Sequence, residues 1–241
     1  MEVNGYKIEP GANLEDAFLY EANLDGANLE DANLQRANLE DANLTGATLE
    51  NANLTGADLR GAHLFVANLK KANLSQANLS RADLRAAHLE NANLEGANLE
   101  VANLHNAYLF QSNLNGAKLT HSKMEGADLS NAFIYNANLQ DANLHTSNLQ
   151  DAELQNANLQ DADLSEANLD GANLEGTNLQ GALLISAFLK DANLKGANLT
   201  DADLAGADLA GANLSGAYLE NANLTCTNLT GATMPDGTIH N

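Results

Sequence analysis

Apolar residues recur along this chain with a period of five. From Ala12 onward a small residue, almost always Ala, is followed two residues later by Leu, and the next small residue comes three residues after that Leu. The first positions run from 12 to 232, so (232 − 12)/5 + 1 gives 45 copies in one phase. In a helix, five residues would rotate each Leu by about 140°, and no apolar stripe would form. The pattern therefore excludes an amphipathic helix.

The same pattern predicts very short strands joined by corners. Residues two apart share one face of a strand, so the Ala and the Leu of each copy point to the same side. The step of three to the next Ala breaks the strand period, so the chain must turn after every Leu. The two residues after each Leu are rich in Gly, Asp, Asn, Glu, Ser and Thr, several of which favour turns. Stacked coils of this kind form a solenoid with an interior of Leu and Ala.

The repeat, seen for example in Ala192-Asn193-Leu194-Lys195-Gly196, resembles the A(D/N)LXX consensus of the pentapeptide-repeat family. The resemblance covers about nine-tenths of the chain. It implies an all-β fold, a right-handed quadrilateral parallel β-helix with about four repeats per coil and about eleven coils. With about 4.8 Å between strands, the rod would be roughly 50 Å long. The ending from Met234 to His240 resembles that of cyanobacterial members.

We divide the chain into an N-terminal cap (1–11), one repeat domain (12–234) and a C-terminal cap or tail (235–241). Residues 1–11 are out of phase with the repeat, and they contain the apolar residues Val3, Tyr6 and Ile8 between turn signals. We expect them to cover the first coil, whose open edge would otherwise invite association. Ile239 lies five residues after Met234, so we expect it to complete a last core layer.

Composition narrows the class of protein. With 32 acidic and 11 basic residues the net charge is −21, which disfavours direct binding to nucleic acid or an anionic membrane. No apolar run is longer than Ala182–Ile185, far below the about 20 residues of a transmembrane helix. The N-terminus lacks the pattern of a signal peptide. The single cysteine, Cys226, excludes a disulfide framework and favours a cytoplasmic location. We expect a free surface thiol there, with a disulfide-linked dimer as the alternative.

A coil of 20 residues would stack residues that are 20 apart. This spacing predicts charge ladders on the surface, with Glu50, Lys70 and Glu90 in one column and Glu40 next to Arg60 in another. Exposed pairs of this kind contribute at most about 1 kcal/mol each. We therefore read most of the charged surface as solvated.

Histidines also fall into columns. His105, Glu125 and His145 share one, but the two histidines would be about 10 Å apart, too far for both to bind one ion at about 2 Å. We expect no metal site there. His88 and Tyr108 are expected to stack as a surface pair.

One region departs from the acidic background. Between Asn51 and Leu89 there are five basic residues and only two acids, Asp58 and Asp83, which gives 5 − 2 = +3. Arg and aromatic residues are enriched at the centres of protein interfaces, so this stretch and the apolar residues after it predict a partner-binding belt. The alternative is scattered variation on a tolerant surface. The candidate surface consists of Arg60, Phe65, Val66, Lys70, Lys71, Arg81, Arg85, Val101 and Phe110.

No arrangement typical of an enzyme is present in the sequence. There is no Gly-rich phosphate loop, Cys/His metal spacing or Gly-x-Ser-x-Gly motif, so we expect no catalytic residues, cofactor or metal. The expected function is a non-enzymatic scaffold that presents a rigid acidic rod to an unknown protein partner, as a monomer or a weak end-to-end dimer. Neither nucleic acid nor membrane is an expected partner.

The alternative function is a DNA-mimicking modulator of DNA gyrase or topoisomerase. The resemblance implies this because some pentapeptide-repeat proteins protect gyrase. Their repeats often carry Phe at the central position, and some have projecting loops. Here the central position is almost uniformly Leu and no loop interrupts the phase, which makes the scaffold the preferred interpretation.

Overall fold

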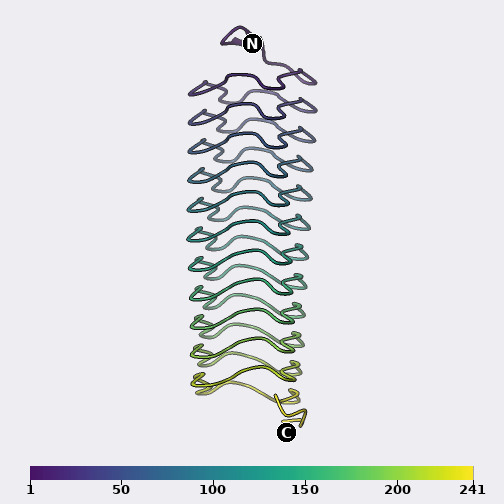
Figure 1. The fold of residues 1–241 in the computed structure, drawn as a ribbon, viewed down its shortest axis with the longest axis vertical. Coiled ribbons are helices and arrows are strands. Elements are labelled where there is room, and N and C mark those ends of the chain that lie inside the picture. The colour runs from purple at the N-terminus through teal and green to yellow at the C-terminus, as the bar shows by residue number, and fades with distance from the viewer. Residues whose placement is uncertain (241) are drawn as a thin grey trace.

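The computed structural model describes residues 1–240 as a tall stack of coils, with the N-terminus at one end and the C-terminus at the other (Figure 1). Isolated parallel bridges join residues 20 apart, from Asn13 with Asn33 to Asn213 with Thr233. One coil therefore contains 20 residues, or four repeats. The fold is the right-handed quadrilateral β-helix that the family resemblance implies.

Each of the four sides takes one repeat from every coil. We number them faces 1 to 4 along the chain. Their centre lines start at Asn13, Phe18, Asn23 and Asn28 and continue in steps of 20 residues. The last two residues of each repeat form the corner that leads to the next face.

The core is a narrow shaft of Ala and Leu side chains. At mid-height Ala102 and Leu104 are both 0% exposed. The backbone of each Leu donates a hydrogen bond to the next coil, as Leu104 N does to Lys123 O at 2.7 Å. Inward polar substitutions differ in their bonding. Ser147 donates to the Leu144 carbonyl at 2.6 Å, whereas the buried Ser112 hydroxyl has no hydrogen-bond partner in the described chain.

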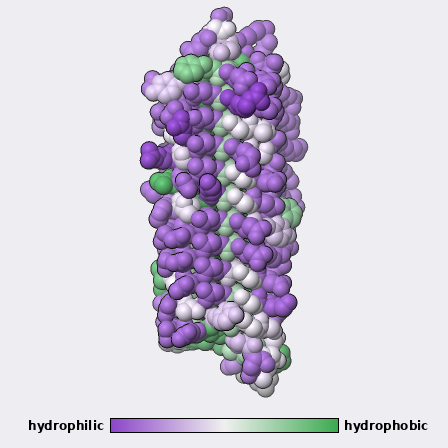
Figure 2. Space-filling model, in the orientation of Figure 1, coloured by the Kyte–Doolittle hydropathy of each residue, from purple (hydrophilic) through white to green (hydrophobic). Residues whose placement is uncertain are grey.

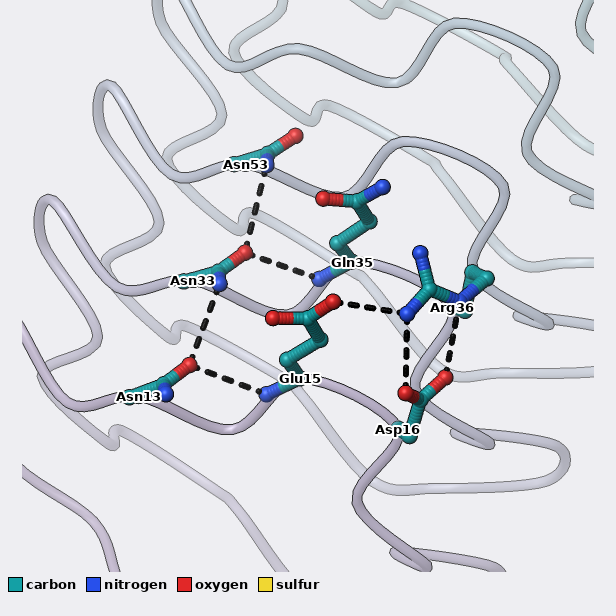
Figure 3. Close-up of polar contacts among 7 residues, drawn as sticks. All are labelled: Asn13, Glu15, Asp16, Asn33, Gln35, Arg36 and Asn53. Atoms are coloured by element: carbon teal, nitrogen blue, oxygen red, sulfur yellow. Dashed lines mark hydrogen bonds and ion pairs between the residues drawn. The ribbon is translucent and has the colours of Figure 1, made fainter.

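Asparagines on the centre lines form ladders between coils (Figure 3). Asn33 Nδ2 donates to Asn13 Oδ1 at 3.0 Å, and Asn53 Nδ2 donates to Asn33 Oδ1 at 3.2 Å. The same oxygens accept bonds within their own repeats, because the Gln35 amide donates to Asn33 Oδ1 at 3.2 Å. The Asn side chain thus joins two coils and also fixes the corner that follows it.

The corners require a left-handed backbone at the fifth residue of nearly every repeat. Asp16 has φ 56° and Asn51 has φ 58°. Asn and Asp tolerate this conformation, so the corner does not need Gly. Val66 and Val101 adopt it too, with φ 50° and 61°, although β-branched residues are strongly disfavoured there.

The N-terminal residues form a small hairpin against the first coil. Strands β1 (Glu2–Val3) and β2 (Tyr6–Lys7) pair antiparallel, with Val3 opposite Tyr6. Asn4 and Gly5 form the turn and both have positive φ. Ile8, which follows β2, is only 3% exposed and joins the core.

The C-terminal residues correct one expectation. Ile239 is 56% exposed, so the prediction that it completes a last core layer is wrong. The turn after Met234 reverses the chain, with Gly237 N donating to Met234 O at 2.9 Å. Thr233 and Ile239 then form an antiparallel bridge. The reversal ends the five-residue phase on which that prediction depended.

Candidate interaction surface

The nine candidate residues lie on three corners of the rod. The corner between faces 2 and 3 carries Arg60, Arg81 and Val101. The corner between faces 3 and 4 carries Phe65, Val66 and Arg85. The corner between faces 4 and 1 carries Lys70, Lys71 and Phe110. The structure thus divides the predicted belt, and only the first six residues flank one face, face 3.

Carboxylates from neighbouring coils neutralise much of the basic excess. Arg60 Nη2 lies 2.8 Å from Glu40 Oε2, and Lys70 Nζ lies 3.2 Å from Glu90 Oε1, which confirms these two ladder contacts. Glu50 is nearest to Lys71, at 4.0 Å, and pairs with it rather than with Lys70. The local charge of +3 counted along the sequence overstates the charge in space, because stacking adds acids from outside the stretch.

Arg85 contacts both Asp83 and Phe65 within the candidate surface. Arg85 Nε and Nη2 donate to the two oxygens of Asp83, at 2.8 and 2.7 Å. Its guanidinium carbon lies 5.4 Å from the centre of the Phe65 ring, within the range of a cation–π contact. The hydrogen bond from Arg85 lowers the pKa of Asp83 below its usual value. Asp83 therefore holds the guanidinium beside an exposed ring.

Val66 and Val101 are exposed in a backbone conformation that disfavours them. Their exposed fractions are 42% and 49%, so their side chains gain little from burial that would offset the strain. Every corner of the rod imposes this conformation, so it does not by itself mark a site. The two residues place exposed apolar side chains on opposite edges of face 3.

The remaining candidates differ in availability. Arg81 is exposed and forms no ion pair with any residue of the described chain. Phe110 is half-buried, so it is a weaker anchor than Phe65. Phe65, Val66, Arg81 and Val101 are therefore the exposed side chains among the nine that form no ion pair within residues 1–240.

A second group of exposed apolar side chains was not among the candidates. Leu183, Ile185 and Phe188 are 42%, 38% and 50% exposed. Leu183 lies on the centre line of face 3, Ile185 on its corner with face 4, and Phe188 on face 4. The signal in the sequence is the replacement of Asn by a large apolar residue at the second position of two consecutive repeats. On the side drawn in Figure 2, most of the surface is hydrophilic and hydrophobic side chains appear as separate spots.

A shallow hollow of about 310 Å³ lies where faces 4 and 1 meet. It is open to solvent and is lined by Phe133, Glu153 and polar side chains of the preceding corner. Nearby on face 4, the rings of His88 and Tyr108 stack at 4.7 Å and 9°, which confirms the predicted pair.

The histidine column contains a close pair rather than a cluster. His105 Nδ1 lies 3.8 Å from Glu125 Oε2. Residues 1–240 contain no group of three or more His, Cys, Asp or Glu side chains placed to hold a metal ion. The described chain also has no helix with the length and hydrophobicity needed to cross a membrane. Cys226 is an exposed free thiol.

Comparisons with known proteins identify the family of the repeat. The family model for pentapeptide repeats (8 copies) matches overlapping segments that together span residues 11–236. HetL, a pentapeptide repeat protein from the cyanobacterium Nostoc sp. strain PCC 7120 that is involved in the regulation of heterocyst differentiation, is 34% identical. That alignment covers 92% of each chain, with a TM-score of 0.42.

Two other solved structures are similar over different extents. Rfr23 from the cyanobacterium Cyanothece 51142 is 46% identical over 39% of this chain and 64% of its own, with a TM-score of 0.37. Full-length QnrB1, a plasmid-mediated fluoroquinolone resistance protein, is 20% identical over 85% of this chain and 90% of its own, with a TM-score of 0.35. No curated protein sequence matches the chain. Because the family model matches well over half of its length, the chain belongs to the pentapeptide-repeat family.

Proposed function

We propose that this chain is a non-enzymatic scaffold that presents a rigid acidic rod to a protein partner in the cytoplasm. The observation that carries the proposal is the set of exposed side chains beside face 3 that the fold itself does not require. Phe65 is 41% exposed beneath the Arg85 guanidinium, and Val66 is 42% exposed in a strained conformation. Exposed aromatic and Arg side chains of this kind are typical anchors of protein interfaces.

The rod suits this role because its outward side chains are held at fixed spacing. Neighbouring coils are about 4.8 Å apart, and each coil bonds to the next through its backbone and its Asn ladders. A partner would meet a surface that is already ordered, so association would cost little conformational entropy.

A pull-down from the native host tests the proposal. The triple variant Arg60→Glu, Arg81→Glu and Arg85→Glu should lose a partner that the wild-type protein recovers. The matched control is Lys118→Glu, Lys190→Glu and Lys195→Glu, which changes the net charge equally but leaves face 3 intact. Equal recovery of the same proteins by the wild type, the triple Arg variant and the triple Lys control would refute an interaction surface beside face 3.

The second candidate is a DNA mimic that acts on DNA gyrase. The observation in its favour is the net charge of −21 on a rod, because DNA-binding enzymes bind regularly spaced negative charge. A gyrase supercoiling assay tests it, since a mimic at micromolar protein would inhibit or protect the enzyme and would lose this effect at high salt. No effect at any salt concentration would exclude this function.

A further inference from the structure

Towards its C-terminal end, face 3 carries two exposed apolar side chains in one coil. Leu183 lies on the centre line and Ile185 on the corner with face 4. We call these two residues the apolar row. Ile185 and Phe65 occupy equivalent positions 120 residues apart, which is 120/20 = 6 coils, or about 29 Å at about 4.8 Å per coil. The apolar row is therefore a separate feature from the surface around Phe65.

The coils directly before and after the apolar row place carboxylates on the same face. On face 3 and its two corners, the preceding coil contributes three carboxylates and the following coil two, so their charge is −5. These positions contain no basic residue in any of the three coils, and the coil of the apolar row is uncharged there. The five residues are Asp161, Asp163, Glu166, Asp201 and Asp203.

No cation of the chain balances this charge. None of the five carboxylates forms an ion pair within residues 1–240, whereas elsewhere on the rod Lys195 lies 2.9 Å from Glu175. Asp163 Oδ1 accepts only from a neighbouring backbone amide at 2.9 Å, and Asp203 Oδ1 accepts from that of Ala205 at 3.0 Å. The negative charge beside the apolar row is therefore available to a cation from another molecule.

The repeat by itself does not account for leucine at position 183. Asn at the equivalent position can donate to the residue one coil before it, as Asn223 Nδ2 does to Asp203 Oδ1 at 2.8 Å. Leu183 follows Asp163 in the same way but has no donor, so this bond is lost. The side chain remains 42% exposed, so burial within the chain offsets only part of the loss. Contact with another molecule would bury the rest.

From this arrangement we propose that the apolar row and its flanking carboxylates bind a short segment of another protein, one that carries apolar side chains between Lys or Arg residues. The segment lies along the rod and crosses the apolar row. This site is separate from the Arg side chains on which the proposed function depends, and it needs none of them.

The spacing of the site fits such a segment. Asp163, Leu183 and Asp203 follow one another on the centre line, and the two carboxylates are two coils apart, about 10 Å. Three residues of an extended chain also span about 10 Å. A cation, two apolar residues and a second cation therefore match the order carboxylate, apolar row, carboxylate. The same charge disfavours nucleic acid and anionic lipid as occupants.

Fluorescence anisotropy of labelled peptides with the purified full chain tests the proposal. The probe is Lys-Lys-Leu-Phe-Lys-Lys, and the comparison peptides are Lys-Lys-Ser-Ser-Lys-Lys and Glu-Glu-Leu-Phe-Glu-Glu. At about 0.1 M salt the Debye length is about 10 Å, so distant carboxylates of the rod contribute little. The probe should bind at least about tenfold more tightly than either comparison peptide, because one lacks the apolar contact and the other is repelled.

Two variants test the apolar row and the carboxylates separately. Leu183→Asn with Ile185→Thr introduces residue types that the repeat uses at these positions and should weaken binding of the probe at least about tenfold. A tenfold loss corresponds to about 55 Å² of apolar contact at about 25 cal/mol/Å². Asp163→Asn with Asp203→Asn should weaken it at least about threefold, through the loss of two exposed ion pairs.

Matched changes elsewhere on the rod serve as controls. Phe133→Asn removes an exposed apolar side chain from face 1, and Glu30→Gln with Asp31→Asn removes two carboxylates from the corner between faces 4 and 1. Each should leave the affinity for the probe within about twofold, because these sites lie far beyond a Debye length. Melting followed by circular dichroism checks that every variant is folded.

A charge reversal gives the sharpest test of the pairing. Asp163→Lys with Asp203→Lys should bind Glu-Glu-Leu-Phe-Glu-Glu in preference to the probe. Lys is already accommodated on this centre line at Lys123, so the fold should tolerate the change. A reversed variant that still prefers the Lys peptide would contradict the assigned contacts.

The remaining outcomes separate this inference from the proposed function. No binding of the probe to the wild type, equal binding of the probe and either comparison peptide, or equal binding by the wild type and both face 3 variants overturns the inference. If it fails in this way and the triple Arg variant still loses a partner in the pull-down, the proposed function stands. If the peptide results are as expected and the triple Arg variant keeps every partner, the surface beside Arg81 and Arg85 is wrong and the present site stands.

Discussion

The two ends of the rod consist of the same repeat, but they are covered differently. At the N-terminal end, Tyr6 and Ile8 pack on the first coil, and Leu19 and Leu24 behind them are 0% exposed. At the C-terminal end, the leucines of the last coil, such as Leu224, are only partly buried. The repeat buries its own leucines only where another layer lies above and below.

Backbone bonding is incomplete at both ends of the rod, because three of the four centre-line amides of the first coil donate to no acceptor within residues 1–240. At the N-terminal edge, Phe18 N donates to the Tyr6 hydroxyl at 3.2 Å, and its carbonyl accepts from Asn4 Nδ2 at 3.4 Å. At the other edge, the amides of Leu219 and Leu224 donate to no carbonyl within residues 1–240. A coil can form backbone hydrogen bonds with an adjoining coil, but the outermost coil needs an irregular segment to bond its free backbone groups. The N-terminal cap provides such bonds at Phe18.

The largest expected effect compares the interior with the C-terminal coil. Leu114→Asp places an unpaired carboxylate in the dry shaft, where Leu114 is 1% exposed, and should destabilise the fold by about 4 kcal/mol or more. Leu224→Asp should have a much smaller effect, because its carboxylate can reach water. Thermal melting followed by circular dichroism measures both. Similar melting temperatures for the two variants would show that the shaft is not dry.

The next prediction removes part of the N-terminal cap. Ile8→Ala should destabilise the protein by about 2 to 4 kcal/mol, because it leaves a cavity over the first coil. The exposed Lys7→Ala serves as the control and should change stability by less than about 0.5 kcal/mol. Urea unfolding measures the loss, and hydrogen exchange should show it first at the amides of Leu14 and Leu19. Unchanged exchange at these amides would mean that the cap does not protect the first coil.

The Asn ladder gives a smaller difference between the interior and the end. Asn93 bonds to Asn73 below it and Asn113 above it, at 3.2 and 3.1 Å, so Asn93→Ala should cost about 1 to 2 kcal/mol. Asn223→Ala, in the exposed last coil, should cost less than about 1 kcal/mol. The urea midpoints of the two variants, compared with wild type, test this order. An equal loss at both positions would indicate that the amide bonds within a repeat matter more than the ladder.

The smallest expected effect depends on pH. Hydrogen bonds from Arg85 and Arg60 lower the pKa values of Asp83 and Asp58 in the folded protein. A carboxyl group whose pKa is lower in the folded protein stabilises the fold at pH values above its pKa in the unfolded chain, about 3.9. This contribution disappears as the pH falls through the folded pKa. Asp83→Asn should therefore cost less than about 1 kcal/mol at neutral pH and nothing once wild-type Asp83 is protonated. If the difference in urea midpoint between the wild type and Asp83→Asn stays constant on acidification, the pairing of Asp83 with Arg85 is wrong.

The sequence predicted the regular parts of this molecule well because each depends on nearby residues. The five-residue phase alone indicated that Ala and Leu point inward, and the spacing of 20 residues predicted the contact between Arg60 and Glu40. It failed at Ile239, where a turn reverses the chain. The sequence also could not show that Asn and Asp adopt the left-handed backbone at the corners as readily as Gly. The residue type at the fifth position varies, but the backbone conformation there does not.

The sequence by itself determined the period, the apolar shaft and the acidic surface, because these follow from which residue types repeat and how often. The spacing of 20 residues also predicted some surface neighbours, but only the tertiary structure decided which of them pair, as Glu50 does with Lys71 rather than with Lys70. Coiling places residues 20 apart in contact and divides the predicted belt among three corners. It also aligns Phe65 and Ile185 on one corner of face 3, about 29 Å apart. The physical reason is that an outward side chain gains its neighbours from the stacking of coils and not from its place in the chain.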